Sequence, residues 1–534
     1  MTLHERAAVL KHQEIGEIAS LLTSYDDLVV TREKLTEENE RLNQQLAWFK
    51  RQVFGPRSER RILDAEGRQM ALGEVLAVEP REVEPTETVR EHARRRRKQP
   101  WEGTPEDSGL RFDPAVVPVE VIEVPNPEIE GLSKESYEVV REKVSYRLAQ
   151  RPGSYVVLEY RRQVVKLKEE KRLVSPSAPP AVLEKSVADV SFLAGLLIDK
   201  FCYYLPLYRQ HQRLEANGIQ LSRVTLTNLV HRVADLLEPI YEALLRSVLE
   251  GRLVVMDETS IKAGRPPEGG KMRTGYFWPV YGDRDEVVFP FSPSRGNRMV
   301  PETLGEFRGV LLSDGYKPYE TYATASEGRV VHAQCWAHAR RNFVEAESSE
   351  PVLCGEALGR IREIYEQEKM IRQEDLEGER KLARRQERSK PIVEAFFEWL
   401  QESLEQHVLL PSNPFTAAAA YARDREAALK VFLEHPYVPI DTNHLERQIR
   451  PIALGRKNYM FCWTEVGAKY VGIVQSLLAT CRLHGVDAYT YLVDVLQRID
   501  THPANRVDEL TPRLWKEQFA QRPLRSAIDR PRGP

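Results

Sequence analysis

Two short apolar runs in the middle of the chain each end in an aspartate. Residues 252–256 (Arg-Leu-Val-Val-Met) precede Asp257, and residues 309–313 (Gly-Val-Leu-Leu-Ser) precede Asp314. Short apolar runs bounded by turn residues are typical of strands buried on both faces of a sheet. Because open α/β sheets carry their sites beyond the carboxyl ends of the strands, we expect both carboxylates to lie at one edge of the sheet.

This arrangement favours a divalent metal ion. Two carboxylates a few ångströms apart repel each other, and burial raises their pKa; a divalent cation relieves both effects. Hard oxygen ligands with room for water and phosphate suit Mg²⁺ or Mn²⁺. An aspartate at a strand end can also be a simple turn or cap residue, so two aspartates alone leave both interpretations open.

A third acid follows a long helical stretch over residues 345–433. Asp441 or Thr442 can cap a helix that carries Glu446 about one turn inside it. Cations surround this glutamate in the sequence, namely Arg447, Arg450, Arg456 and Lys457. An acid amid arginines and lysines is what a site that binds both a metal ion and a phosphodiester backbone requires.

The flanking segments alternate between strand and helix patterns. Further strands are expected at 275–281 and 286–291, joined by a hairpin turn at 282–283, and at 329–333, before a helix that starts at Trp336. Upstream, residues 155–160 and 163–167 are predicted to form paired strands of a small β module.

A helical block is expected over residues 187–249. It contains a helix at 207–216, a turn at Asn217–Gly218 and a second helix that Ser222 can cap. This is the outline of a helix-turn-helix DNA-binding unit, although any helical hairpin shares it.

The N-terminal residues show a heptad pattern. Leucine or phenylalanine recurs every seven residues, at Leu21, Leu28, Leu35, Leu42 and Phe49. With Asn39 at an alternate core position, this favours a parallel two-stranded coiled coil; a single amphipathic helix packed on the protein is the alternative. The charged segment that follows contains a basic run at 90–98, which is either a solvated linker or a non-specific phosphate contact.

In these and further motifs the chain resembles the transposases of the insertion-sequence "sixty-six" family. The matching motifs are Asp257-Glu-Thr, Asp314-Gly-Tyr, the stretch from Gln334 to Arg341 (Gln-Cys-Trp-Ala-His-Ala-Arg-Arg), Asp441-Thr-Asn-His-Leu-Glu-Arg, and Ala453-Leu-Gly-Arg-Lys-Asn. They are joined upstream by Leu205-Pro-Leu-Tyr-Arg-Gln and Phe54-Gly-Pro-Arg-Ser-Glu, so that nearly the whole chain is covered in family order.

The resemblance implies an α/β fold with a ribonuclease-H-like catalytic core that is interrupted by a helical insertion. An N-terminal coiled coil, a small β module and a helical, helix-turn-helix-like domain precede this core. The expected parts are a coiled-coil dimerisation helix (1–63), a charged linker (64–118), the β module (119–180), a helical DNA-binding domain (181–250), the first part of the core (251–344), the insertion (345–433), the second part of the core (434–500) and a C-terminal tail (501–534).

The resemblance also implies an activity, namely metal-dependent cleavage of DNA ends and strand transfer by phosphoryl transfer. Asp257, Asp314 and Glu446 become the catalytic metal ligands of an Asp-Asp-Glu triad, with two Mg²⁺ or Mn²⁺ ions. Seven basic residues are candidates for DNA contacts: Arg223, Arg340, Arg341, Arg447, Arg450, Arg456 and Lys457. The alternatives are a ribonuclease-H-like nuclease that does not join strands and a catalytically silent DNA-binding derivative.

The expected partners are double-stranded DNA, at least one more copy of the chain, and helper proteins encoded by the same element. The net charge is only −3, so any basic DNA-binding surface must be local. No apolar run approaches the roughly 18 residues of a membrane span. Five scattered cysteines without a CxxC pair indicate a reducing compartment, and we expect a cytoplasmic protein.

Family members often carry a zinc-binding cysteine cluster between the coiled coil and the catalytic domain. Here no cysteine occurs before Cys202, so we predict no structural zinc and a β module that is held together by a core of its own. Cys335 and His338 have the spacing of half a zinc site, but no second pair is evident and the resemblance favours a structural role.

Overall fold

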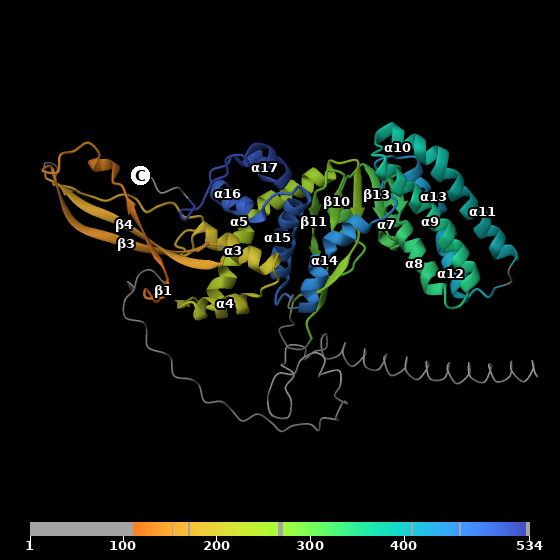
Figure 1. Cartoon of the computed structure of the whole chain (residues 1–534), viewed down its shortest axis with the longest axis horizontal. Helices are drawn as coiled ribbons and strands as arrows, with labels where there is room; N and C mark the ends of the chain where they lie inside the picture. Colours follow the sequence, from red (N-terminus) through yellow and green to blue (C-terminus); the bar gives the residue numbers. More distant parts are fainter. Residues whose placement is uncertain are drawn as a thin grey trace, which may run out of the picture. The chain divides into compact units, whose positions relative to one another are not determined.

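A computed structural model describes residues 110–529, apart from short gaps at 152, 169–170, 265–270, 407–408 and 459–460. The predicted coiled coil and most of the predicted linker lie outside these residues. Within the described part the fold is mixed α/β, with the sheets in its N-terminal half and mainly helices in its C-terminal half (Figure 1). None of the described helices is both long and apolar enough to cross a membrane.

A long β-hairpin dominates the first sheet. Its two long strands pair antiparallel along their whole lengths, and two shorter strands pair with the other edge of the second long strand. The four strands are β2 (Val119–Val124), β3 (Tyr137–Arg151), β4 (Ser154–Leu167) and β5 (Leu173–Val174). The prediction that residues 155–160 and 163–167 pair with each other is wrong, because both segments belong to β4 and the hairpin turn lies at Gly153, whose φ is +87°.

The hairpin is only partly held by a core of its own. At its far end Val165, Leu167 and Val174 form a small separate cluster. At its base Leu148 and Val157 are fully buried in the main core of the protein. The sequence-based expectation of a self-sufficient core is therefore wrong for the base of the hairpin.

Three helices follow, and each start and turn has a local cause. They are α3 (Val190–Phe201), α4 (Leu207–Ala216) and α5 (Arg223–Leu249). Asp189 accepts a backbone hydrogen bond at the start of α3, and Ser222 does the same for α5. Gly218, with φ +77°, reverses the chain after α4. The next residues form β6 (Ile219–Gln220), which pairs with β1 (Arg111–Phe112), so the end of the predicted linker is folded onto the helical block.

The central part of the chain forms two sheets. The five-stranded sheet has the order β11-β10-β7-β13-β14, and the three-stranded sheet has the order β12-β9-β8. β10 runs antiparallel to both β11 and β7, whereas β13 runs parallel to both β7 and β14. The strands are β7 (Leu253–Met256), β8 (Thr259–Lys262), β9 (Thr274–Phe277), β10 (Val280–Gly282), β11 (Val287–Val288), β12 (Phe291–Ser292), β13 (Gly309–Ser313) and β14 (Val330–Gln334).

Two of the predicted strands are split between these sheets. The segment 275–281 divides into β9 and β10, and the segment 286–291 divides into β11 and β12. A proline lies at each break, Pro279 in the first and Pro290 in the second. Proline has no N–H for the ladder, so each of these segments changes sheet at its proline.

In the described residues, the predicted insertion consists of helices and the loops between them, and it packs against the β14 side of the five-stranded sheet (Figure 1). It follows α6 (Met299–Leu304), α7 (Lys317–Ala325) and α8 (Trp336–Ala346). Its helices are α9 (Pro351–Gln373), α10 (Gly378–Arg384), a π-helical turn (Arg385–Ser389), α11 (Lys390–Gln406), α12 (Pro414–Arg423), α13 (Glu426–Lys430) and a short 3₁₀ turn (Val431–Leu433).

A buried arginine fixes the insertion internally. Arg385 is fully buried, and its guanidinium donates two hydrogen bonds of 2.8 Å to the carboxylate of Glu368 on α9. It also donates to the backbone carbonyls of Phe432, His435 and Val438. The π-helical turn is thereby tied both to α9 and to the segment that returns the chain to the sheet.

The C-terminal helices close the other edge of the sheet. They are α14 (Asn443–Asn458), α15 (Glu465–Leu483), α16 (Ala488–Arg498), a 3₁₀ stretch (Ala504–Leu510) and α17 (Pro512–Gln518). Side-chain hydroxyls of α15 hydrogen-bond the β11 edge, Thr480 to Val287 and Ser476 to the N–H of Phe289. These bonds satisfy backbone groups that an open sheet edge would expose.

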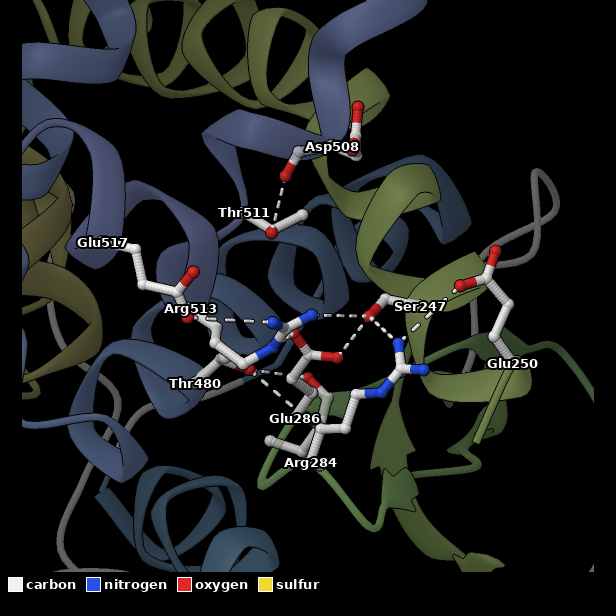
Figure 2. Close-up of polar contacts among 10 residues, drawn as sticks. Ser247, Glu250, Arg284, Glu286, Thr480, Asp508, Thr511, Arg513 and Glu517 are labelled. Carbon is white, nitrogen blue, oxygen red and sulfur yellow. Dashed lines mark hydrogen bonds and ion pairs between the residues drawn. The ribbon is translucent and has the colours of Figure 1, made fainter. Parts of the chain in front are cut away.

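A buried acid joins the last helices to the sheet. Glu286 is fully buried, and its carboxylate accepts hydrogen bonds from Arg513 at 2.9 Å and from Ser247 at 2.6 Å (Figure 2). Arg513 belongs to α17 and Ser247 to α5. We call Ser247, Glu286 and Arg513 the C-terminal anchor; Figure 2 shows Arg284 reaching the same serine.

Candidate active site

The two predicted aspartates end neighbouring parallel strands. Asp257 follows β7 and Asp314 follows β13, and in the register of these strands Leu312 lies opposite Val255. Continuing that register by two residues places Asp314 opposite Asp257, on strands about 4.8 Å apart. Backbone N–H groups hold one oxygen of each carboxylate, that of Glu258 at 2.7 Å for Asp257 and that of Tyr316 at 2.9 Å for Asp314.

Glu446 comes from α14, whose start is fixed against the end of β14. Asp441 caps this helix by accepting the N–H of Asn443 at 3.1 Å. The backbone N–H of Trp336 donates to the carbonyl of Ile440 at 3.1 Å. The thiol of Cys335 accepts hydrogen bonds from the backbone and the hydroxyl of Thr442. The residues that follow β14 therefore position the first turn of α14, which carries the glutamate.

These contacts give Cys335 a structural role. Its side chain is buried, and burial raises the pKa of its thiol, which stays protonated at neutral pH. His338 lies one turn further on, and burial lowers the pKa of its imidazole, while the charges of Asp314 and Glu446 act in the opposite direction. His338 is therefore a neighbour of the candidate acids.

The electrostatics of Asp257 are unusual for a surface acid. Burial, followed by the negative charges of Asp314, Glu258 and Glu446, raises the pKa of Asp257 to about 7. Among the described residues, no cation forms an ion pair with its carboxylate. Asp314 and Glu446 thus lie close enough to Asp257 to repel its negative charge, and the fold itself supplies little compensation for that charge.

A fourth acid, Glu258, was not singled out from the sequence. Its side chain is buried, and its carboxylate accepts hydrogen bonds from the guanidinium of Arg295 at 3.0 Å and from the hydroxyl of Tyr319 at 3.0 Å. The Arg295 side chain also lies over the ring of Tyr316, 4.2 Å from its centroid. Glu258 is therefore neutralised within the fold, unlike its neighbour Asp257. The adjacent Asp-Glu pair at a strand end was the only local signal for it.

Asp257 and Glu446 line a cleft of about 520 Å³, whereas Asp314 is not among its lining residues. Its lining comes from the end of β7 and from one face of α14, and we call it the α14 cleft. The lining residues are Asp257, Glu258, Asn443, Glu446, Arg447, Ile449, Arg450 and Ala453. The cleft therefore combines two of the predicted acids with two of the predicted cations.

The remaining predicted DNA contacts are distributed unevenly. Arg341 approaches the carboxylate of Glu446 at 3.7 Å, and Arg340 lies beside it on α8. Arg456 donates to the carbonyl and, at 2.9 Å, to the hydroxyl of Ser260, so part of its guanidinium is engaged within the fold. Lys457 is exposed one residue further on.

Arg223 is not among the residues that line the α14 cleft. It is the first residue of α5, is exposed, and lies 5.7 Å from the ring centroid of Tyr208 on α4. It therefore belongs to the helical hairpin formed by α4 and α5.

The carboxylate oxygens of the predicted acids are the type of ligand that divalent cations such as Mg²⁺ bind. Within residues 110–529, apart from the gaps, no three acidic, histidine or cysteine side chains are already gathered into a metal-binding cluster. The carboxylates of Asp257, Asp314 and Glu446 are nevertheless hard oxygen donors, and the uncompensated charge on Asp257 is what a bound cation would neutralise. The residues present therefore fit Mg²⁺ or Mn²⁺.

Three parts of the chain match models of known protein families. Residues 185–470 match the model described as Transposase IS66 family, and residues 476–513 match its C-terminal element. Residues 41–106 match a model described as Transposase C of IS166 homeodomain. This whole match lies outside the described residues.

The chain is also similar to proteins of Sinorhizobium fredii that are named as uncharacterized. It is 30% identical to y4hP over 402 residues, which is 71% of this chain and 72% of that protein. It is 30% identical to y4qI, covering 74% and 75%, and 31% identical to y4jD, covering 65% and 70%. The similarity thus extends over most of the length of these proteins.

Proposed function

The chain belongs to the IS66 family of transposases, and we propose that it is a DDE enzyme that cuts the DNA ends of an insertion sequence and joins them to target DNA. One observation carries this proposal. Asp257 and Asp314 follow adjacent parallel strands, and Glu446, in the first turn of α14, lies close enough to Asp257 to raise the pKa of that buried carboxyl.

The sheet supports a ribonuclease-H-like core. Three antiparallel strands, β11, β10 and β7, are continued by the parallel strands β13 and β14, and the two aspartates follow the central strand β7 and its neighbour β13. The helical insertion separates β14 from α14 in the sequence. This strand order and the position of the insertion support our proposal that the catalytic core is ribonuclease-H-like.

Asp257, Asp314 and Glu446 would hold two Mg²⁺ or Mn²⁺ ions. Such ions activate a water or a 3′-hydroxyl as nucleophile and stabilise the leaving oxygen. Basic side chains of the protein would bind the DNA. Arg447 and Arg450 lie on the same helix as Glu446 and line the cleft, where each can contact a phosphate oxygen.

Other residues of the chain keep the acids in place. Arg295 and Tyr319 donate hydrogen bonds to the Glu258 carboxylate, so that only one acid of this pair keeps an uncompensated charge. Cys335 and Thr442 fix the first turn of α14. Double-stranded DNA, a second copy of the chain and helper proteins of the same element are the partners that we propose.

The decisive experiment replaces each acid by its amide. Asp257→Asn, Asp314→Asn and Glu446→Gln should abolish both cleavage of a duplex that carries the element's terminal repeats and joining of its 3′ ends, while affinity for that duplex stays within about twofold. Asp424→Asn changes an exposed acid of the insertion and should behave as wild type. Strand joining by the Asp314→Asn protein would refute the triad; cleavage without joining by the wild-type protein would show a nuclease instead.

A further inference from the structure

A second cavity, of about 650 Å³, lies between α8 and α9, the first helix of the insertion. Asn443, at the start of α14, lines both this cavity and the α14 cleft. We call the second cavity the α8–α9 groove. The shared residue makes it the direct continuation of the candidate active site onto the insertion.

The groove is cationic. Arg340 and Arg341 from α8 and Arg362 from α9 line it, against one acid, Glu347. Among the described residues, neither Arg340 nor Arg362 forms an ion pair, and Arg341 makes only the 3.7 Å contact with Glu446. The charges of Arg340 and Arg362 therefore do not balance acids within the described residues, whereas phosphate oxygens would bind them with charge-assisted hydrogen bonds.

Two glycines on α9 leave one wall of the groove without side chains. Gly355 and Gly359 lie one turn apart and both line the groove. Glycine inside a helix costs stability relative to alanine. Packing does not explain that cost here, because a Cβ added at either position would meet no described atom within 4 Å. The bare backbone instead leaves room for something that the isolated chain does not contain.

One residue of the groove contacts the start of α14, the helix that carries Glu446. Tyr365 on α9 lines it and lies beside Asp441, the residue that caps α14; burial, followed by the negative charge of Asp441, raises the pKa of the tyrosine. Whatever occupies the groove therefore lies against the contact that joins the insertion to the helix bearing Glu446.

We infer that the α8–α9 groove binds the sugar–phosphate backbone of the DNA strand that continues beyond the scissile phosphate. This inference rests on the proposed function and gives the insertion a DNA-binding role. From Gly355 to Arg362 the groove follows about 10 Å of α9, at 1.5 Å per residue. That length corresponds to about three nucleotides of one strand of a duplex, at 3.4 Å each. Arg362 therefore contacts a phosphate within about three or four nucleotides of the cleavage site.

The test pairs one side chain with one phosphate. Duplexes carrying the element's end are made with a single neutral methylphosphonate at each position on either side of the cleavage site, and binding to the full-length protein is measured in EDTA. For the wild type, one or two positions close to the cleavage site should lose about tenfold in affinity, the range expected for a hydrogen bond between charged groups. Arg362→Ala should lose about as much with the unmodified duplex and no more with those methylphosphonates.

Arg372→Ala is the matched control, because Arg372 is exposed on the same helix and does not line the groove. It should bind as wild type and keep the full sensitivity to every methylphosphonate. An Arg362→Ala protein with the same behaviour would overturn the inference. Because binding in EDTA needs no catalysis, loss of this coupling would leave the triad untouched, and failure of the triad would leave the coupling measurable.

The glycines provide a second, independent readout. Exchanging both Gly355 and Gly359 for alanine should raise the melting temperature, because alanine favours the helix and the added methyl groups meet no neighbouring atom. The same exchange should weaken binding of the end duplex severalfold, because the methyl groups would occupy the groove. Raised stability with unchanged binding would overturn close approach of the backbone. A lowered melting temperature would also overturn it, by showing that these glycines serve packing.

Discussion

Replacing Asp257 by asparagine should make the metal-free protein more stable at pH 8, although it destroys the proposed active site. Burial and the neighbouring acids raise the pKa of Asp257 from 3.8 to about 7. Each unit corresponds to about 1.36 kcal/mol, so the folded state carries a penalty of about 4 kcal/mol when this carboxyl is ionised. Asparagine has no charge to bury, and its side-chain oxygen can still accept the N–H of Glu258.

The sign of the pH dependence follows from the raised pKa. The folded protein holds this proton more tightly than the unfolded chain, so its contribution to stability is fully present below about pH 4 and is lost as the pH rises through 7. The advantage of Asp257→Asn should therefore be largest at pH 8 and shrink by more than half at pH 5.

Urea unfolding in EDTA, followed by tryptophan fluorescence, measures this advantage as a shift of the transition midpoint at both pH values. Asp424→Asn, on the exposed surface, should shift neither midpoint. A midpoint for Asp257→Asn at or below that of the wild type at pH 8, or a gain independent of pH, would refute the electrostatic account.

Three further predictions concern other parts of the chain. Arg385→Ala leaves the buried Glu368 carboxylate unpaired and should destabilise the protein by about 3–5 kcal/mol, seen as an earlier thermal transition; an unchanged transition would contradict the role of this pair. Arg450→Ala should flatten the dependence of log affinity for DNA on log salt by about one unit, equally for end-containing and random duplexes, whereas an unchanged slope would exclude a phosphate contact. A peptide of residues 1–60 should be helical and dimeric, and light scattering that finds a monomer at tens of micromolar would remove the coiled coil.

The strand-end aspartates could be placed from the sequence because their signal is local. An apolar run that ends in an acid specifies both a buried strand and the position of the carboxylate, and both runs, before Asp257 and before Asp314, form the expected strands. The cap and turn residues around α4 and α5, such as Ser222, were identifiable for the same reason.

Features that depend on distant partners were missed or misplaced. The carboxylate of Glu258 is neutralised by Arg295 and Tyr319, which lie 37 and 61 residues further along the chain. The length of β4 was underestimated because the polar pair Arg161 and Arg162 looks like a turn, yet both residues continue the ladder with β3 and β2. The split of two strands had a local signal in their prolines, but which sheet each half joins is decided by tertiary pairing.

The C-terminal anchor also determines when this part of the protein can finish folding during translation. Glu286 must wait for Arg513, which lies 227 residues later in the chain. At about 5–20 residues per second, a ribosome needs roughly 10–45 s to cover that interval, during which the Glu286 carboxylate lacks its guanidinium partner. A nascent chain of this protein therefore cannot complete the C-terminal anchor before Arg513 has been made, and a chain that terminates before this residue should retain a buried Glu286 carboxylate without its guanidinium partner.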